Sequence, residues 1–287
     1  MDVNGDGKLD ILSGSYSRRI SDMAGLFHVL SGNPDGTFQK PRPLAGTDGE
    51  PLTLPAGEER RNIIDNICTR PFACDLNGDG KLDLVVGNFR GTFGFFQGEG
   101  AGKFRPQATW LEADGSALAV EYHSDPYLVD WDGDGDLDLL SGSSAGGAFL
   151  FANVGTKTAP KFGPRQMLVP PAVPAAGAQQ LGDAHYVAPA RDTRVWAADI
   201  DGNGKLDLLL GDSVTLYYVA SGVDAATARA KDVKWKKKQQ VHMGAYPQNG
   251  DAAAMKKWQE NYRKLEAERK AFVREEKTGF VWLFRRK

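Results

Sequence analysis

Several features that assign proteins to common classes are absent from this 287-residue sequence. It has no run of about 18 apolar residues, so no membrane-spanning helix is expected. Its beginning does not resemble a signal peptide, because Met1 leads directly into an acidic, glycine-rich stretch. The two cysteines, Cys68 and Cys74, are too few for a disulfide scaffold, and their spacing permits either a local bridge or free thiols.

Catalytic and cofactor-binding patterns are also missing. The four histidines are scattered, without a zinc-binding spacing. His123, Ser124 and Asp125 are adjacent in the chain, whereas the members of a catalytic triad converge from separate segments. There is no phosphate-binding loop, dinucleotide fingerprint or nucleophile elbow. We find no catalytic constellation and favour a non-enzymatic role, while the enzyme question stays open.

The net charge is only −2, but the charges are unevenly distributed. Residues 224–287 contain 17 Lys and Arg against 8 Asp and Glu, so the rest of the chain is acidic. The basic residues lie among helix-forming acids rather than among aromatic residues, so nucleic-acid binding is not expected.

What the sequence does contain is a nine-residue acidic pattern that occurs four times. The copies are at 2–10, 75–83, 130–138 and 199–207, and they share D-x-[DN]-x-[DN]-G-x-L-D followed by an apolar run and a Gly. Their starts are 73, 55 and 69 residues apart. A period of this length indicates a repeat architecture in which neighbouring units bury one another's faces.

The side chains of this pattern predict a calcium site. Calcium takes about six to eight oxygen ligands in a forgiving geometry, and positions 1, 3, 5 and 9 all carry oxygen. The Gly at position 6 permits the bend that returns position 9, while the variable position 7 is expected to offer its backbone carbonyl. About four structural Ca²⁺ are predicted. The candidate ligands are Asp2, Asn4, Asp6, Lys8, Asp10, Asp75, Asn77, Asp79, Lys81, Asp83, Asp130, Asp132, Asp134, Asp136, Asp138, Asp199, Asp201, Asn203, Lys205 and Asp207.

Two other interpretations of the loops are less favourable. A set of acidic surface turns does not explain four copies that all end in Leu-Asp and a strand-like run. An EF-hand requires Glu at position 12 and a helix after the loop, and these loops lack the Glu and precede a short apolar strand.

Loops of this type, each followed by LDLLxG or a close variant, resemble the FG-GAP/VCBS repeats of integrin-type calcium β-propellers. The resemblance covers most of the chain from Met1 to about Gly222 and the last ten residues. It implies four-stranded blades with calcium between the first two strands, in about four blades that form an incomplete arc. The implied function is a calcium-binding extracellular or envelope module for binding or adhesion. The alternative is a carbohydrate-active propeller, either a lectin or a polysaccharide lyase-like enzyme.

Each repeat predicts the same succession of strands. The fourth strand of a blade is expected to open at Phe38, Phe104 or Phe162. The other predictions are lead-in strands at 72–74, 127–129 and 195–198, second strands at 82–87, 137–142 and 206–211, and third strands at 25–30, 91–96 and 147–151. The long connections at 46–62 and 165–194 are the candidate binding rim.

The last repeat departs from this pattern. Asp224 is expected to cap a helix to about Gln240, and Asp251 a second one to about Lys277. The stripe in the second helix is Met255, Trp258, Tyr262, Leu265 and Phe272. Residues 279–284 match the third-strand pattern, so 224–276 is predicted to be a helical hairpin inserted in the last blade of one propeller segment, 1–287.

The two ends of the chain lie inside blades, which predicts a fragment. Only Met1 precedes the first loop, and no fourth strand follows 279–284. We therefore expect weak calcium binding at 2–10 and a missing upstream sequence that carries an export signal. The expected location is secreted, periplasmic or at the cell surface, with an unidentified protein or glycan as ligand.

Overall fold

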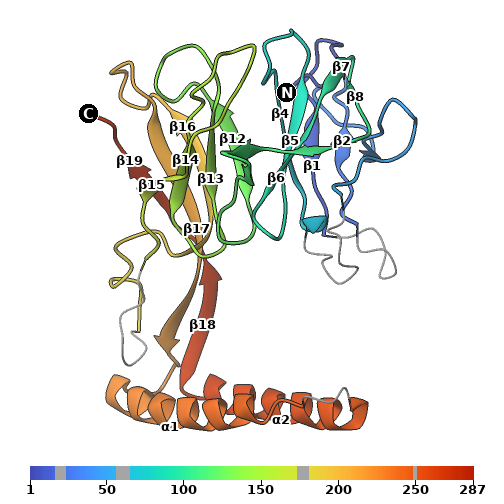
Figure 1. Cartoon of the computed structure of the whole chain (residues 1–287). Coiled ribbons are helices and arrows are strands. Elements are labelled where there is room, and N and C mark those ends of the chain that lie inside the picture. Colours follow the sequence, from blue (N-terminus) through green and yellow to red (C-terminus); the bar gives the residue numbers. More distant parts are fainter. Residues whose placement is uncertain (17–23, 56–64, 173–180, 248–250) are drawn as a thin grey trace. The chain divides into compact units, whose positions relative to one another are not determined.

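The computed structural model describes residues 1–16, 24–55, 65–172, 181–247 and 251–287, and it divides into two compact units (Figure 1). Unit 1 contains residues 1–172, 188–212 and 280–287. Unit 2 contains residues 173–187 and 213–279. Among the described residues, no helix has the length and apolar character needed to span a membrane.

Unit 1 consists of four small antiparallel sheets that are the blades of a β-propeller, as predicted. Blade one contains β1 (Ile11–Ser13), β2 (His28–Leu30) and β3 (Arg42–Pro43). Blade two contains β4 (Arg70–Cys74), β5 (Asp83–Gly87), β6 (Phe93–Phe96) and β9 (Thr109–Trp110). Blade three contains β12 (Asp125–Val129), β13 (Asp138–Gly142), β14 (Ala148–Phe151) and β15 (Gln166–Val169).

In unit 1, blade four is formed by β16 (Arg191–Ala198), the first half of β17 (Asp207–Val219) and β19 (Val281–Phe284). Residues 208–211 of β17 pair with 281–284 of β19, which confirms the predicted third strand after the helical segment. The lead-in and second strands of blades two and three also lie where the sequence placed them.

Two short ribbons complete blade two, and one of them corrects a prediction. They are β7 (Gly98–Gly100) with β8 (Lys103–Phe104), and β10 (Glu112–Ala113) with β11 (Ser116–Ala117). Phe104 does not open a fourth strand; it pairs back to Gly98, just after the third strand. Phe38 and Phe162 make the same return contact with Gly32 and Asn153. In each of these blades, the phenylalanine therefore closes a turn back onto the residues that follow the third strand, and the fourth strand begins several residues later.

Neighbouring blades are joined by apolar side chains that alternate along each strand. On β5, Leu84 and Val86 face the core shared with blade one, and Val85 faces the core shared with blade three. All three are fully buried. This alternation follows from the two-residue period of a strand, and it lets one sheet contribute to two cores.

A buried hydroxyl six residues before each of the last three loops also joins the blades. Thr193 accepts a hydrogen bond from the N–H of Ser143 at 2.9 Å and donates to the carbonyl oxygen of Gly147 at 2.7 Å. Thr69 and Ser124 make the equivalent contacts with the preceding blade. This feature was not predicted, although the Ser or Thr recurs at a fixed distance from each of these three loops.

Unit 2 combines a strand pair with two helices. Residues 214–219 of β17 pair with β18 (Val273–Thr278), and between them lie α1 (Ala225–Gly244) and α2 (Ala252–Lys270). The predicted N-caps are confirmed, because Asp224 accepts from Thr227 N–H and Asp251 from Ala253 N–H, both at 2.9 Å.

The predicted end of the second helix is wrong. The helix ends at Lys270 rather than near Lys277, because 273–278 pairs with β17. Its predicted stripe does contact α1, since the indole N–H of Trp258 donates to the carbonyl of His242 at 3.0 Å.

Arg269 is buried between the rings of Trp235 and Tyr217 and donates to Asp232 at 2.9 Å. Unit 2 therefore has a small core built around a paired charge.

The two cysteines are free thiols, so no local bridge forms. Cys74 is buried in β4, and burial raises the pKa of its thiol far above the ordinary value. The candidate rim loops are only partly described, because residues 56–62 of the first and 173–180 of the second lie outside the described residues.

Candidate metal centre

Each of the last three acidic loops connects the first and second strands of a blade. Loop three, residues 130–138, connects β12 to β13, and the loops at 75–83 and 199–207 have the same place in blades two and four. Glycines at positions 4 and 6 have positive φ in all four loops, such as 87° at Gly133 and 95° at Gly135. The prediction identified only position 6, yet the left-handed backbone at both positions curls the loop around its own carboxylates.

The carboxylate at position 1 organises the turn of the loop. In loop three, Asp130 accepts the N–H of Gly133 at 2.7 Å and the N–H of Gly135 at 3.0 Å. In loop four, residues 199–207, Asp199 accepts from Gly202 at 2.7 Å and from Gly204 at 2.9 Å. Position 1 therefore stabilises the loop conformation as well as offering oxygen to a cation.

Positions 3 and 5 continue this pattern toward the second strand. Asp132 accepts the N–H of Asp134 at 3.2 Å, and Asp134 accepts the N–H of Asp136 at 3.0 Å. These are short-range Asx-type contacts that fix the side chains without tertiary support. We call positions 1 to 5 the loop head; the acids at 130, 132 and 134 are half-buried or exposed.

Position 9, which we call the loop base, has a different environment. Asp138 is 1% exposed and accepts the N–H of Trp131 at 2.9 Å with one oxygen and the N–H of Asn153 at 2.7 Å with the other. It thereby ties the start of the loop to the end of the third strand. Burial raises the pKa of Asp138, while the two backbone hydrogen bonds act in the opposite direction.

The same two contacts recur at every loop base. One oxygen accepts the N–H at position 2, and the other accepts an N–H just after the third strand. The equivalent residues are Asp10, which accepts from Val3 and Gly32, Asp83, which accepts from Leu76 and Gly98, and Asp207, which accepts from Ile200 and Arg286. The sequence predicted position 9 as a ligand, but its structural role as a tie became apparent only in the fold.

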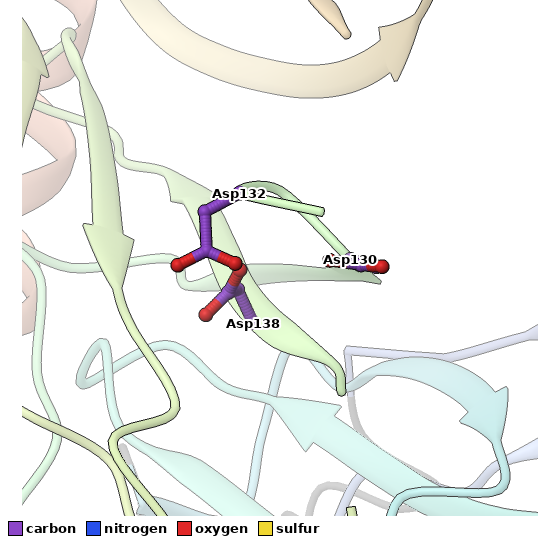
Figure 2. A group of neighbouring side chains, drawn as sticks. All are labelled: Asp130, Asp132 and Asp138. Carbon is purple, nitrogen blue, oxygen red and sulfur yellow. The ribbon is translucent and has the colours of Figure 1, made fainter. Parts of the chain in front are cut away.

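Two of the four loops bring three acidic side chains together. Asp130, Asp132 and Asp138 each offer a carboxylate oxygen within 4.8 Å of the other two, and Figure 2 shows Asp132 and Asp138 turned toward one another. Asp199, Asp201 and Asp207 form the same arrangement in loop four. Two oxygens on one Ca²⁺ are at most about 5 Å apart, because calcium–oxygen distances are about 2.3–2.6 Å. The spacing fits a shared cation.

The remaining predicted ligands are arranged differently. Asp134 and Asp136 do not belong to the converging group of loop three. The loops at 2–10 and 75–83 have an amide at position 3, Asn4 or Asn77, and within the described residues they do not gather three acids. In loop four, the amide nitrogen of Asn203 donates to the carbonyl of Arg286 at 3.0 Å.

Asp136, at position 7 of loop three, has an environment that no other described loop repeats. It is 6% exposed, and its Oδ1 has no hydrogen-bond partner. Burial raises the pKa of this carboxyl, and the neighbouring carboxylates of Asp134, Asp138, Asp132 and Asp130 raise it further. A buried, unpaired oxygen among acids is unfavourable unless a cation compensates it, so the donor set of loop three fits a hard metal ion.

Comparison with known proteins agrees with this architecture over part of the chain. Residues 75–141 match the family described as FG-GAP-like repeat. The matched segment begins at the first residue of the second loop and ends within β13, so it includes two of the acidic loops. No curated protein matches the chain. The fold and the match together define a β-propeller that contains an FG-GAP-like repeat.

Proposed function

We propose that this chain is a calcium-binding propeller that serves as a binding or adhesion module outside the cytoplasm or in the cell envelope. Its calcium is structural, with about four ions, one for each acidic loop. The observation that supports this best is loop three, where three carboxylates converge within 4.8 Å and the buried Asp136 oxygen lacks a partner.

In this proposal the positions of each loop have different roles. The acids at positions 1, 3 and 9 of loops three and four hold the ion, and calcium supplies the positive charge that lets them lie together. Position 5 completes the shell with its side chain and position 7 with its backbone carbonyl, and in loop three the Asp136 carboxylate adds negative charge beside the ion. Loop three has the most carboxylates, and affinity rises with ligand charge, so it is proposed to bind most tightly.

Titration calorimetry of the calcium-free chain tests the metal. We expect uptake of about four Ca²⁺, the tightest of which is weakened about tenfold or more in Asp132→Asn and unchanged in the control Lys81→Ala. Asn at 132 keeps the oxygen that accepts the Asp134 N–H and removes only the charge. A chain that takes up no calcium contradicts the proposal.

The binding role rests on the propeller scaffold, since rigid blades present loops at their ends. We propose a protein or glycan ligand and a secreted, periplasmic or cell-surface location. We further propose that residues 1–287 act as one propeller segment, with the segment 224–276 inserted in its last blade. A glycan array, probed with calcium and again with chelator, tests the ligand class. Calcium-dependent capture of glycans supports a lectin-like role, and a blank array in both conditions favours a protein ligand.

A further inference from the structure

A cluster of charged side chains lies where the lead-in strands of blades two, three and four begin. Its members are Arg70 in β4, Asp125 in β12 and Arg194 in β16, and each directly follows one of the hydroxyl residues that join the blades. The acidic loops follow the other ends of these strands. Since β4 and β12 each have five residues, the cluster lies about 15 Å from the proposed calcium sites.

The charges in this cluster are unequal. Nη1 of Arg194 lies 2.9 Å from Oδ1 of Asp125, and Nε of Arg70 lies 3.9 Å from the same oxygen. One carboxylate thus faces two guanidinium groups, and Arg70 has the weaker contact. Arg191 and Asp192 beside them are exposed and carry opposite charges, so they add no net charge. The cluster therefore has one positive charge in excess, on the side of Arg70.

Arg70 is held in place and is only partly exposed. Its side chain is 20% exposed, and its Nη1 donates to the carbonyl oxygen of Ser124 at 3.3 Å. Burial, and after it the nearby charge of Arg194, lower the pKa of Arg70. The surroundings thus disfavour the charge of this guanidinium, and an additional anion would stabilise it.

His123 extends the set of donors around Arg70. Nη2 of Arg70 lies 3.3 Å from Nδ1 of His123. A guanidinium can only donate, so Nδ1 accepts and the proton of the neutral ring is on Nε2. Burial and the charge of Arg70 lower the pKa of His123, which favours this neutral form. Arg70 and His123 together therefore offer N–H donors to a ligand.

Two aromatic side chains lie beside these donors. The ring of Phe89 is centred 4.5 Å from the ring of His123 and 6.0 Å from the ring of Tyr122. The N–H of His123 donates to the carbonyl oxygen of Phe89 at 2.9 Å, which fixes the two segments against each other. Phe89 is half-buried, and Tyr122 is 54% exposed. An aromatic surface that reaches solvent therefore adjoins the excess positive charge.

The backbone beneath this aromatic surface is strained. Tyr122 has a φ of 56°, in the left-handed region that residues with a bulky side chain seldom adopt. Its counterparts in blades two and four, Ile67 and Arg191, do not have a positive φ. The conformation is therefore specific to blade three, where the phenol ring lies against Phe89. Strain of this kind gathers at ligand sites.

We propose that this surface binds a uronate, the carboxylate-bearing sugar of an acidic glycan. Arg70 and the Nε2–H of His123 donate to the carboxylate, since a guanidinium matches the two oxygens of such a group. Tyr122 and Phe89 pack against the C–H face of the sugar ring, because aromatic rings offer a large apolar contact area. A uronate site rests on the glycan ligand of the proposed function and narrows it to acidic sugars.

Titration calorimetry with a trimer of galacturonate, and with the neutral galactose trimer, tests this site. We expect the acidic trimer to bind about tenfold or more tightly than the neutral one, because only the acidic sugar pairs with Arg70. Arg70→Gln should weaken binding of the acidic trimer about tenfold or more. The matched control is Arg105→Gln, which should leave binding unchanged, since Arg105 is 57% exposed, pairs with Glu99 and lies outside the cluster.

Tyr122→Asn tests the aromatic surface separately from the charge. Asn tolerates a positive φ and lacks the ring, so binding should weaken several-fold while the backbone stays as it is. Melting curves and calcium uptake check that both variants are folded, because the cluster and the acidic loops lie at opposite ends of the strands.

Four results would overturn the uronate site. They are no binding of the acidic trimer, equal binding of the two trimers, binding of acetate as tightly as the acidic trimer, and equal effects of Arg70→Gln and Arg105→Gln. Equal binding of the two trimers leaves the proposed glycan role standing. Selective binding of the acidic trimer by a chain that takes up no calcium contradicts the metal proposal alone.

Discussion

The head and the base of one acidic loop contain the same residue type in opposite surroundings. At the base, Asp138 is buried, and its two oxygens accept backbone N–H groups from the start of the loop and from the residues after the third strand. At the head, Asp132 is exposed and accepts a hydrogen bond only from within the loop. Identical carboxylates therefore tie two strands together at one end of the loop and accept only local hydrogen bonds at the other.

This difference separates a contribution to the fold from a contribution to calcium binding, and the sequence motif alone does not distinguish the two. The base contributes to stability whether or not calcium is present, because its partners are backbone groups. Apart from the position 1 carboxylate, which also orders the turn, the head contributes mainly when a cation offsets the repulsion among its acids. The following predictions test this separation, from the largest expected effect to the smallest.

Asp138→Ala should be the most damaging change. It leaves the N–H groups of Trp131 and Asn153 without their charged acceptor, at a cost on the order of 4 kcal/mol of unfolding free energy. Urea denaturation should show this loss in chelator and a larger loss with calcium, because position 9 is also a proposed ligand of the ion. A loss that disappears with chelator would mean that the base acts only through the metal.

Removal of calcium from the intact chain should have the next largest effect. A site held at a hundred times its dissociation constant adds about 2.7 kcal/mol to stability, so chelation should lower the melting temperature clearly. Differential scanning calorimetry with calcium, with magnesium and with EDTA measures this. Three superimposable curves would contradict a structural role for calcium.

Asp132→Asn should affect the head alone. We expect calcium affinity of loop three to fall about tenfold or more, since ligand charge tunes affinity. Stability in chelator should change by no more than about 0.5 kcal/mol, as for other exposed substitutions. A large loss of stability without calcium would show that the head, too, holds the fold.

Asp136→Asn should stabilise the calcium-free chain, by up to about 1 kcal/mol, because it removes a buried charge among four carboxylates. The same change should weaken calcium binding and so reverse sign when calcium is present. Chemical denaturation in the two conditions measures the crossover, and a variant less stable in both would contradict the unfavourable environment assigned to this side chain.

Lys81→Ala should be nearly silent. Its backbone N–H donates to Asp79 at 2.9 Å whatever the side chain, and the side chain is exposed. Calcium titration and melting temperature should both stay within experimental error of the parent chain. A marked loss of affinity would mean that position 7 contributes more than its backbone.

The sequence was most informative where chemistry and spacing repeat. Four copies of one acidic pattern predicted the blades, their first two strands and the returning strand at 279–284, and the structure confirmed these. Asp224 and Asp251 were recognisable as caps because an N-cap acts locally, on N–H groups two or three residues away.

Predictions failed where a distant partner decided the outcome. The segment Val273–Thr278 is rich in charge and reads as helix, but pairing with 214–219 of β17 makes it a strand. The turn phenylalanines pair with the end of the third strand, a contact that their own neighbours do not indicate. In both cases tertiary hydrogen bonding overrode local propensity.

By itself, the sequence determined the all-β repeat, the oxygen-rich loops and the capped helices, because each depends on residues within one turn or one alternating strand. Only the tertiary structure decided which carboxylates converge, that position 9 is a buried tie, and that the hydroxyls of Thr69, Ser124 and Thr193 join the blades. These properties depend on burial and on backbone groups far away in the chain, and a residue's type does not specify what the fold places beside it.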